Sequence, residues 1–166
     1  MEKNNFKNFV SNIFRRRELG IFFVLIVVLF VVGLRSTTFF TADNWNDLLI
    51  YVSILVIVAI GQLMTMTTGG IDLSVGSVLA LSGMSAGVIM RSNPSMHPLV
   101  LMLISTMVGL ACGTINGLII SKGKVHPLIT TLATLAIYRG LVVKVSGNRW
   151  INFSEFTKGV RLIARG

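Results

Sequence analysis

Residues 67–77 have the sequence TTGGIDLSVGS and lie near the middle of an apolar region that runs from Leu48 to Met90. Asp72 is the only charged residue in that region. A lone carboxylate at membrane depth is costly, so it normally faces protein or water and not lipid. The glycines before it and the serine after it predict that one helix ends here and another begins. The candidate residues of this helix break, and of a translocation path beside it, are Gly69, Gly70, Asp72, Ser74, Gly76 and Ser77.

Two interpretations of the break remain open from the residues alone. Non-helical backbone inside a bilayer is tolerated where protein or a water-filled cavity satisfies its N–H and C=O groups, and such breaks recur at binding and translocation sites. Alternatively, the stretch is a tight hairpin at the cytoplasmic surface, in which Asp72 only caps the following helix. The residue types favour neither interpretation.

Composition places the chain among membrane proteins. Of its 166 residues, 53% are hydrophobic and 13% are charged, and the mean hydropathy is +0.80. These values exclude an ordinary soluble domain and are typical of a polytopic membrane protein. The net charge of +9 is explained by basic residues that flank membrane spans and set their orientation, so it does not indicate a nucleic-acid partner.

Apolar runs predict an all-α transmembrane bundle of about five spans, because a span needs about 20 predominantly apolar residues. The predicted spans are residues 19–34 (extended to Thr38), 48–66, 75–90, 99–120 and 128–143, with the Gly-Gly/Asp break between the second and third. Asp43 or Asn44 is expected to cap the second helix. Basic residues at 1–18 predict a cytoplasmic N-terminus. Residues 19–143 are then the transmembrane domain, and residues 144–166 are predicted to be an extracytoplasmic tail that leads to a further span.

Two stripes of like residues follow the helical period. The fourth span carries small residues at every fourth position, which predict close packing against a neighbouring helix such as the third span; they are Ser105, Gly109, Gly113 and Gly117. Asn116 lies beside this stripe and is expected either to form a hydrogen bond to another helix or to line a path. Helix packing is the favoured interpretation of the stripe itself. The fifth span carries a polar stripe formed by Thr130, Thr131, Thr134 and Tyr138.

No catalytic constellation is evident. No G-K-[ST] follows the glycines of the central stretch, so it is not a phosphate loop. His97 and His126 fall in predicted loops on opposite sides of the membrane and cannot share a metal ion. The sequence therefore predicts neither an enzyme nor a metal or cofactor site.

Two stretches resemble one family of bacterial transporters. Residues 67–83, TTGGIDLSVGSVLALSG, are similar to the signature of the inner-membrane permeases of ATP-binding-cassette (ABC) sugar importers of the ribose, xylose, rhamnose and autoinducer-2 type. Residues 127–140, PLITTLATLAIYRG, are similar to the P-x-x-x-T-L…R-G segment of the same family, in the expected order. The resemblance covers nearly the whole chain and corresponds to the N-terminal half of a family member.

The resemblance implies a permease subunit, not itself an enzyme, that imports a monosaccharide or sugar-like solute across the bacterial inner membrane. The implied partners are an ATPase subunit on the cytoplasmic side, a periplasmic solute-binding protein and a second permease subunit. The hydroxyls of the polar stripe in the fifth span would then face the solute. The alternative is a truncated or split permease fragment that has no transport activity of its own.

Overall fold

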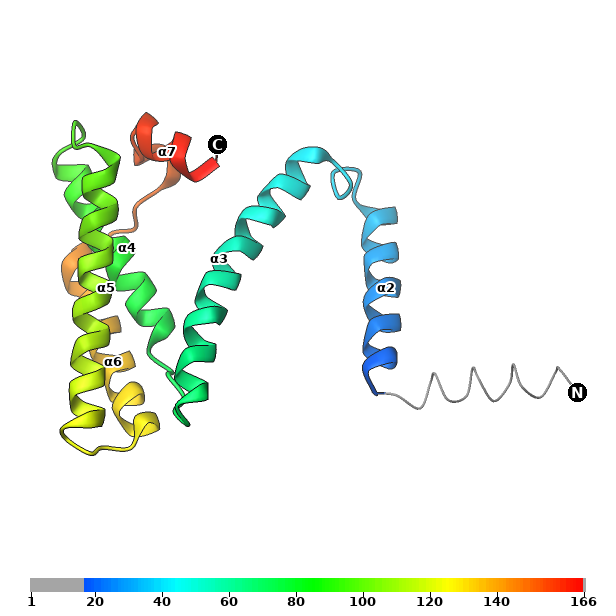
Figure 1. Cartoon of the computed structure of the whole chain (residues 1–166). Coiled ribbons are helices and arrows are strands. Elements are labelled where there is room, and N and C mark those ends of the chain that lie inside the picture. The colour runs from blue at the N-terminus through cyan, green and yellow to red at the C-terminus, as the bar shows by residue number, and fades with distance from the viewer. Residues whose placement is uncertain (1–16, 166) are drawn as a thin grey trace, which may run out of the picture. The chain divides into compact units, whose positions relative to one another are not determined.

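The computed structural model describes residues 17–165, which form helices and no strand. In chain order the elements are α2 (Arg17–Arg35), α3 (Ala42–Thr67), α4 (Val75–Ser92), α5 (Pro98–Ser121), α6 (Pro127–Ser146), the 3-10 helix η1 (Phe153–Glu155) and α7 (Lys158–Arg165) (Figure 1). Within this part of the chain, α3 to α6 are long and apolar enough to span a membrane, and α2 contains a shorter apolar stretch. The predicted all-α polytopic fold with a break between α3 and α4 is confirmed. Residues 1–16 of the predicted basic N-terminus lie outside the described residues.

The first apolar helix is shorter than predicted. α2 ends at Arg35 and does not extend to Thr38. The chain turns after Arg35, and the ring of Phe40 lies over Gly33, where an added Cβ would be 2.5 Å from Phe40 Cε2. The apolar part of α2 is therefore Leu19–Arg35, and the predicted extension to Thr38 is wrong.

The second helix begins earlier than predicted and has a different cap. α3 starts at Ala42, and the backbone N–H of Asn44 donates to Thr41 Oγ1 at 3.4 Å. Thr41 is thus the capping residue, and the prediction of Asp43 or Asn44 is wrong. Both of those residues lie inside the first turn, where the carboxylate of Asp43 is favourable beside the positive end of the helix dipole.

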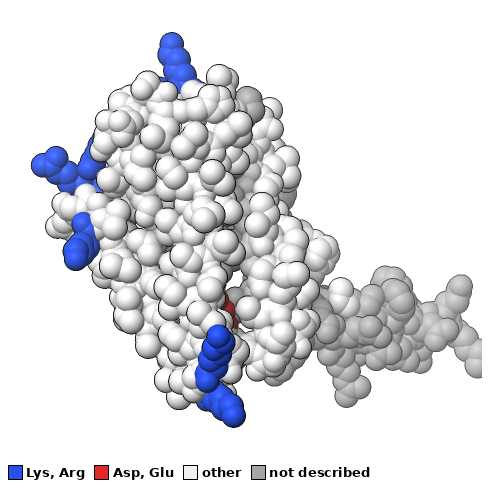
Figure 2. All heavy atoms as spheres, turned by 60° about the vertical axis from the view of Figure 1, so that its left-hand side comes forward, with Lys and Arg blue, Asp and Glu red and all other residues white. Residues whose placement is uncertain are grey.

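The chain forms two compact units that divide within α3, after Val52. In the second unit, which comprises residues 53–165 of the described chain, α4 is the central helix. It packs against both α5 and α6, whereas α5 and α6 contact each other more sparsely (Figure 1). Leu81 of α4, Cys112 of α5 and Tyr138 of α6 meet in a small buried core. Lys and Arg side chains lie toward the ends and one edge of the face shown in Figure 2, and the surface between them is uncharged except for one recessed acidic spot.

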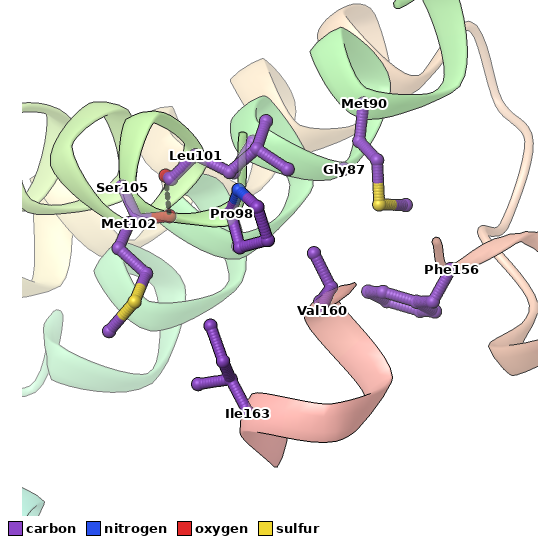
Figure 3. A pocket seen from close by; sticks show the side chains of 11 residues that line it. Gly87, Met90, Pro98, Leu101, Met102, Ser105, Phe156, Val160 and Ile163 are labelled. Carbon is purple, nitrogen blue, oxygen red and sulfur yellow. Dashed lines mark hydrogen bonds between the residues drawn. The ribbon is translucent and has the colours of Figure 1, made fainter. Parts of the chain in front are cut away.

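The C-terminal segment folds back onto the bundle at the end where α4 joins α5. Phe156 and Val160 pack on a core formed by Ala86, Met90 and Leu101 (Figure 3). An apolar cavity of about 240 Å³ remains between this segment, α4 and α5. Residues 144–166, predicted as a tail, are thus partly helical: α6 continues to Ser146 before the chain turns back.

The three glycines of the small-residue stripe on α5 have open space beside them. A Cβ added at Gly109, Gly113 or Gly117 would meet no neighbouring atom of the described chain within 4 Å. The buried residues of α5 are instead Leu101, Cys112 and Asn116. Cys112 and Asn116 each precede a glycine of the stripe, which places them about 100° around the helix. No described residue packs on Gly109, Gly113 or Gly117, and Ser105 borders the apolar cavity beside α4. The packing of this stripe against a neighbouring helix stays a prediction.

Candidate functional site

The two glycines of the central stretch end α3 in a Schellman motif. Gly69 has φ +79°, a left-handed conformation that glycine adopts without steric cost. The N–H of Gly69 donates to the Met66 carbonyl at 3.0 Å, and the N–H of Gly70 donates to the Thr65 carbonyl at 3.1 Å. This hydrogen-bond pattern satisfies carbonyls at the end of the helix that would otherwise lack partners.

We expect Gly69→Ala to destabilise the protein and Gly61→Ala to have no such effect. The left-handed backbone costs a residue with a Cβ roughly 1–2 kcal/mol. Gly61 lies inside α3 with open space around it, where alanine is favoured over glycine by about 1 kcal/mol. Thermal unfolding in detergent compares the two variants. A shift of the same sign and size for both would contradict the left-handed turn.

Asp72 holds the residue before α4. Its Oδ1 accepts hydrogen bonds from the backbone N–H and from the hydroxyl of Ser74, both at 2.7 Å. Ser74 is fully buried, at 0% exposure, whereas Asp72 is half-buried. The described residues make no hydrogen bond to the other carboxylate oxygen, Oδ2. The carboxylate therefore braces the start of α4 through one oxygen and leaves the second available.

A chain of hydrogen bonds continues from Ser74 into the bundle. Asn116 Nδ2 donates to Ser74 Oγ at 2.8 Å. The hydroxyl of Tyr138 donates, at 3.1 Å in each case, to Asn116 Oδ1 and to the carbonyl of Cys112. Asn116 and Tyr138 are both buried. The network thus joins the break to α5 and α6 and satisfies polar groups that would be costly to bury alone.

The start of α4 is recessed from the end of the bundle. Asn116, which contacts Ser74, lies five residues before the end of α5, or about 7.5 Å at 1.5 Å per residue. Gly70, by contrast, lies against Pro127 at the first turn of α6. The non-helical segment therefore turns at the level of the α5–α6 connection and enters the bundle before α4 begins. Thr131 supports it there by donating to the Ile71 carbonyl at 3.2 Å.

A cavity of about 380 Å³ lies beside this segment, between the end of α3, α5 and the start of α6. Its polar lining includes Thr65, Thr68, Asp72, Asn116 and Thr131. Gly113 and Gly117 form part of the α5 wall, and because they have no side chain they leave this space open. Part of the glycine stripe thus borders a cavity, an arrangement that the packing interpretation did not include.

The other candidate residues lie outside this cavity. Thr130 and Thr134 are buried, and their hydroxyls donate to carbonyls of their own helix, at His126 and Thr131 respectively. Ser77 is buried and donates to the Ser74 carbonyl, while Gly76 has open space beside it. Of the predicted hydroxyl stripe, only Thr131 lines the cavity.

Asn116 is the residue that the candidate set left out. Its signal in the sequence was that it is the only amide side chain in the predicted fourth span. That signal did not identify its hydrogen-bond partners, since Ser74 and Tyr138 lie 42 and 22 residues away in the chain.

The family model and the relatives that match this chain are all described as permease components. A model of the family described as "Branched-chain amino acid transport system / permease component" matches residues 44–163. The D-allose transport system permease protein AlsC of Escherichia coli (strain K12) is 36% identical over 130 residues, which cover 78% of this chain and 40% of that protein. No solved structure matches the chain.

Two further relatives extend the comparison. The ribose import permease protein RbsC of Haemophilus influenzae is 34% identical over 150 residues, 90% of this chain and 45% of that protein. The autoinducer 2 import system permease protein LsrC of Yersinia pseudotuberculosis is 28% identical over 143 residues, 86% of this chain and 39% of that protein. The chain spans less than half the length of each of these relatives.

Proposed function

The chain belongs to the family of branched-chain amino acid transport system permease components, and from this membership we propose that it forms part of the permease of an ATP-driven importer for a monosaccharide or sugar-like solute. Two of the relatives are named for sugars, allose and ribose. The structural observation that carries the proposal is the buried network from Asp72 to Tyr138 beside a cavity. Polar and charged groups within membrane spans are costly and tend to mark solute paths.

In this proposal the break and the cavity lie on the solute path. Asp72 and Ser74 hold the break open at the cavity, where Asp72 Oδ2 and the exposed Thr68 offer polar groups to a hydroxylated solute. Gly69 and Gly70 set the turn, while Thr130, Thr134 and Ser77 support the packing around it. In this proposal further helices complete the path, because these relatives are about twice as long as this chain.

The proposed partners are an ATPase subunit on the cytoplasmic side, a periplasmic solute-binding protein and a second permease subunit. One feature favours additional protein around this chain. No residue of α3 is buried by the rest of the described chain, although most of its side chains are apolar. The second candidate function is a permease fragment without transport activity, which the coverage of less than half of each relative favours.

Uptake by intact cells tests the proposal. Cells that carry the gene and cells in which an early stop codon interrupts it are compared for energy-dependent uptake of radiolabelled allose and ribose. We expect uptake of at least one sugar to be lost in the interrupted strain and restored by re-expression. Unchanged uptake of a panel of monosaccharides would contradict a transport role and favour the fragment.

We also propose an inner-membrane location with the N-terminus in the cytoplasm. Lys122 and Lys124 lie in the α5–α6 connection, and basic connections remain on the cytoplasmic side. In a Cys112→Ser background, an impermeant maleimide applied to spheroplasts should label Ser95→Cys. It should label Ser121→Cys only after the membrane is permeabilised. Labelling of Ser121→Cys from outside would contradict this orientation, and with it the extracytoplasmic position of residues 144–166.

A further inference from the structure

We propose that Asp72 makes the cavity beside the break reject anions, so that it accepts uncharged hydroxylated solutes and excludes phosphorylated or carboxylated ones. This selectivity deepens the proposed function, on which it rests for the identification of the cavity with the solute path. The charge preference itself is a property of the cavity and is measurable without transport.

The charge on the cavity wall comes from one residue. Asp72 is the only charged side chain that lines the cavity, whose other walls are hydroxyl, amide, glycine and apolar groups. No described residue forms an ion pair with Asp72. Within the cavity wall, its negative charge is therefore offset only by the hydrogen bonds at Oδ1, and it acts on whatever enters the cavity.

The geometry also suits a hydroxylated solute. Oδ1 is occupied by Ser74, whereas Oδ2 is free to accept a hydrogen bond from a solute hydroxyl. Charge-assisted hydrogen bonds of this kind are stronger than those between neutral groups. A phosphate or carboxylate group offers mainly acceptors and would meet a like charge instead.

The size of the expected discrimination follows from Coulomb's law. A fixed unit charge about 8 Å from an anion, at an effective dielectric constant of about 20, disfavours that anion roughly thirty-fold. Water and salt in a cavity that is open to solvent weaken the effect, so we expect about threefold for an anion at moderate ionic strength. A cation is favoured by the same factor, so the ratio of cation to anion should change about tenfold.

The α5–α6 connection, whose flanking residues Ile120 and Pro127 line the cavity, has the opposite charge. Lys122 and Lys124 lie in the exposed α5–α6 connection and do not line the cavity. Ser121, at the end of α5, is likewise exposed and outside the lining. The reactivity of a thiol at position 121 therefore reports the charge of the two lysines, whereas that of a thiol on the cavity wall reports the charge of Asp72.

Thiol modification compares these two positions in the full chain, in detergent, with Cys112→Ser as background. Thr68→Cys places a thiol on the cavity wall and Ser121→Cys places one outside it. Each is treated with a cationic and an anionic methanethiosulfonate of similar size, and the ratio of the two rates is measured. We expect Asp72→Asn to lower the cation-to-anion ratio about tenfold at Thr68→Cys and to leave it unchanged at Ser121→Cys.

Two further measurements separate charge from altered folding. Asp72→Glu keeps the charge and should keep the ratio at Thr68→Cys, and high salt should lower that ratio in the protein with Asp72 intact. An equal ratio with Asp72 and with Asn, or a ratio insensitive to salt, would overturn the inference. If the uptake experiment shows no transport but the rate ratio at Thr68→Cys still depends on Asp72, the proposed transport function is contradicted and the charge preference of the cavity is not.

Discussion

Solute uptake by the complete importer should fall to background when Asp72 is replaced by alanine, with the protein still inserted in the membrane. The substitution removes the acceptor for the N–H and the hydroxyl of Ser74, which is fully buried. A buried donor left without a partner costs about 1–3 kcal/mol. The segment before α4 must therefore rearrange to find other acceptors, and it borders the cavity that we place on the solute path.

Asparagine separates geometry from charge at this position. Asp72→Asn retains an oxygen that accepts from Ser74, so its uptake should be intermediate. Uptake is measured together with membrane abundance, and Ser82→Ala is a matched control because its hydroxyl bonds only to its own helix, at the Leu79 carbonyl. If Asp72 merely capped a surface hairpin, Asp72→Asn and Asp72→Ser would both transport normally. Unimpaired uptake by Asp72→Ala at normal membrane abundance would contradict a role of Asp72 in solute transport.

The second large effect is expected at Asn116, which bonds to two other parts of the second unit. Asn116→Leu keeps the approximate size of the side chain but removes its hydrogen bonds to Ser74 and Tyr138. At about 0.5–1.5 kcal/mol for each bond, the loss should be about 1–3 kcal/mol. This is a large fraction of the stability of a marginal bundle, and it should lower the unfolding midpoint in detergent.

A double-mutant cycle assigns this loss to the network. Tyr138→Phe removes the hydroxyl that donates to Asn116 and to the Cys112 carbonyl. The effects of Asn116→Leu and Tyr138→Phe should be less than additive, since both remove the same bond. Thr114→Val is the matched control, because Thr114 is exposed and bonds only within α5, to the Leu110 carbonyl. Additive effects, or an equal loss for Thr114→Val, would contradict a shared network.

The sequence by itself determined the helices and the position of the break. Length and apolarity are local properties, so the runs around α3 to α6 predict membrane spans without knowledge of their neighbours. The two glycines before Asp72 likewise act locally, because the left-handed conformation of Gly69 and the hydrogen bonds of its turn involve only residues 65–70. The two errors, the extension of the first span to Thr38 and the cap at Asp43 or Asn44, concern helix boundaries, where short turns compete with helix continuation.

Only the tertiary structure decided which helix faces meet. On α5, the glycine stripe and the side that carries Asn116 are adjacent, and helical periodicity allows either to face α4. The choice depends on partners supplied by distant segments: Ser74 and Tyr138 satisfy the amide of Asn116, whereas nothing in the described chain covers Gly109, Gly113 or Gly117. Burying an amide without such partners is costly, and the residues that remove this cost come together only when α4, α5 and α6 pack.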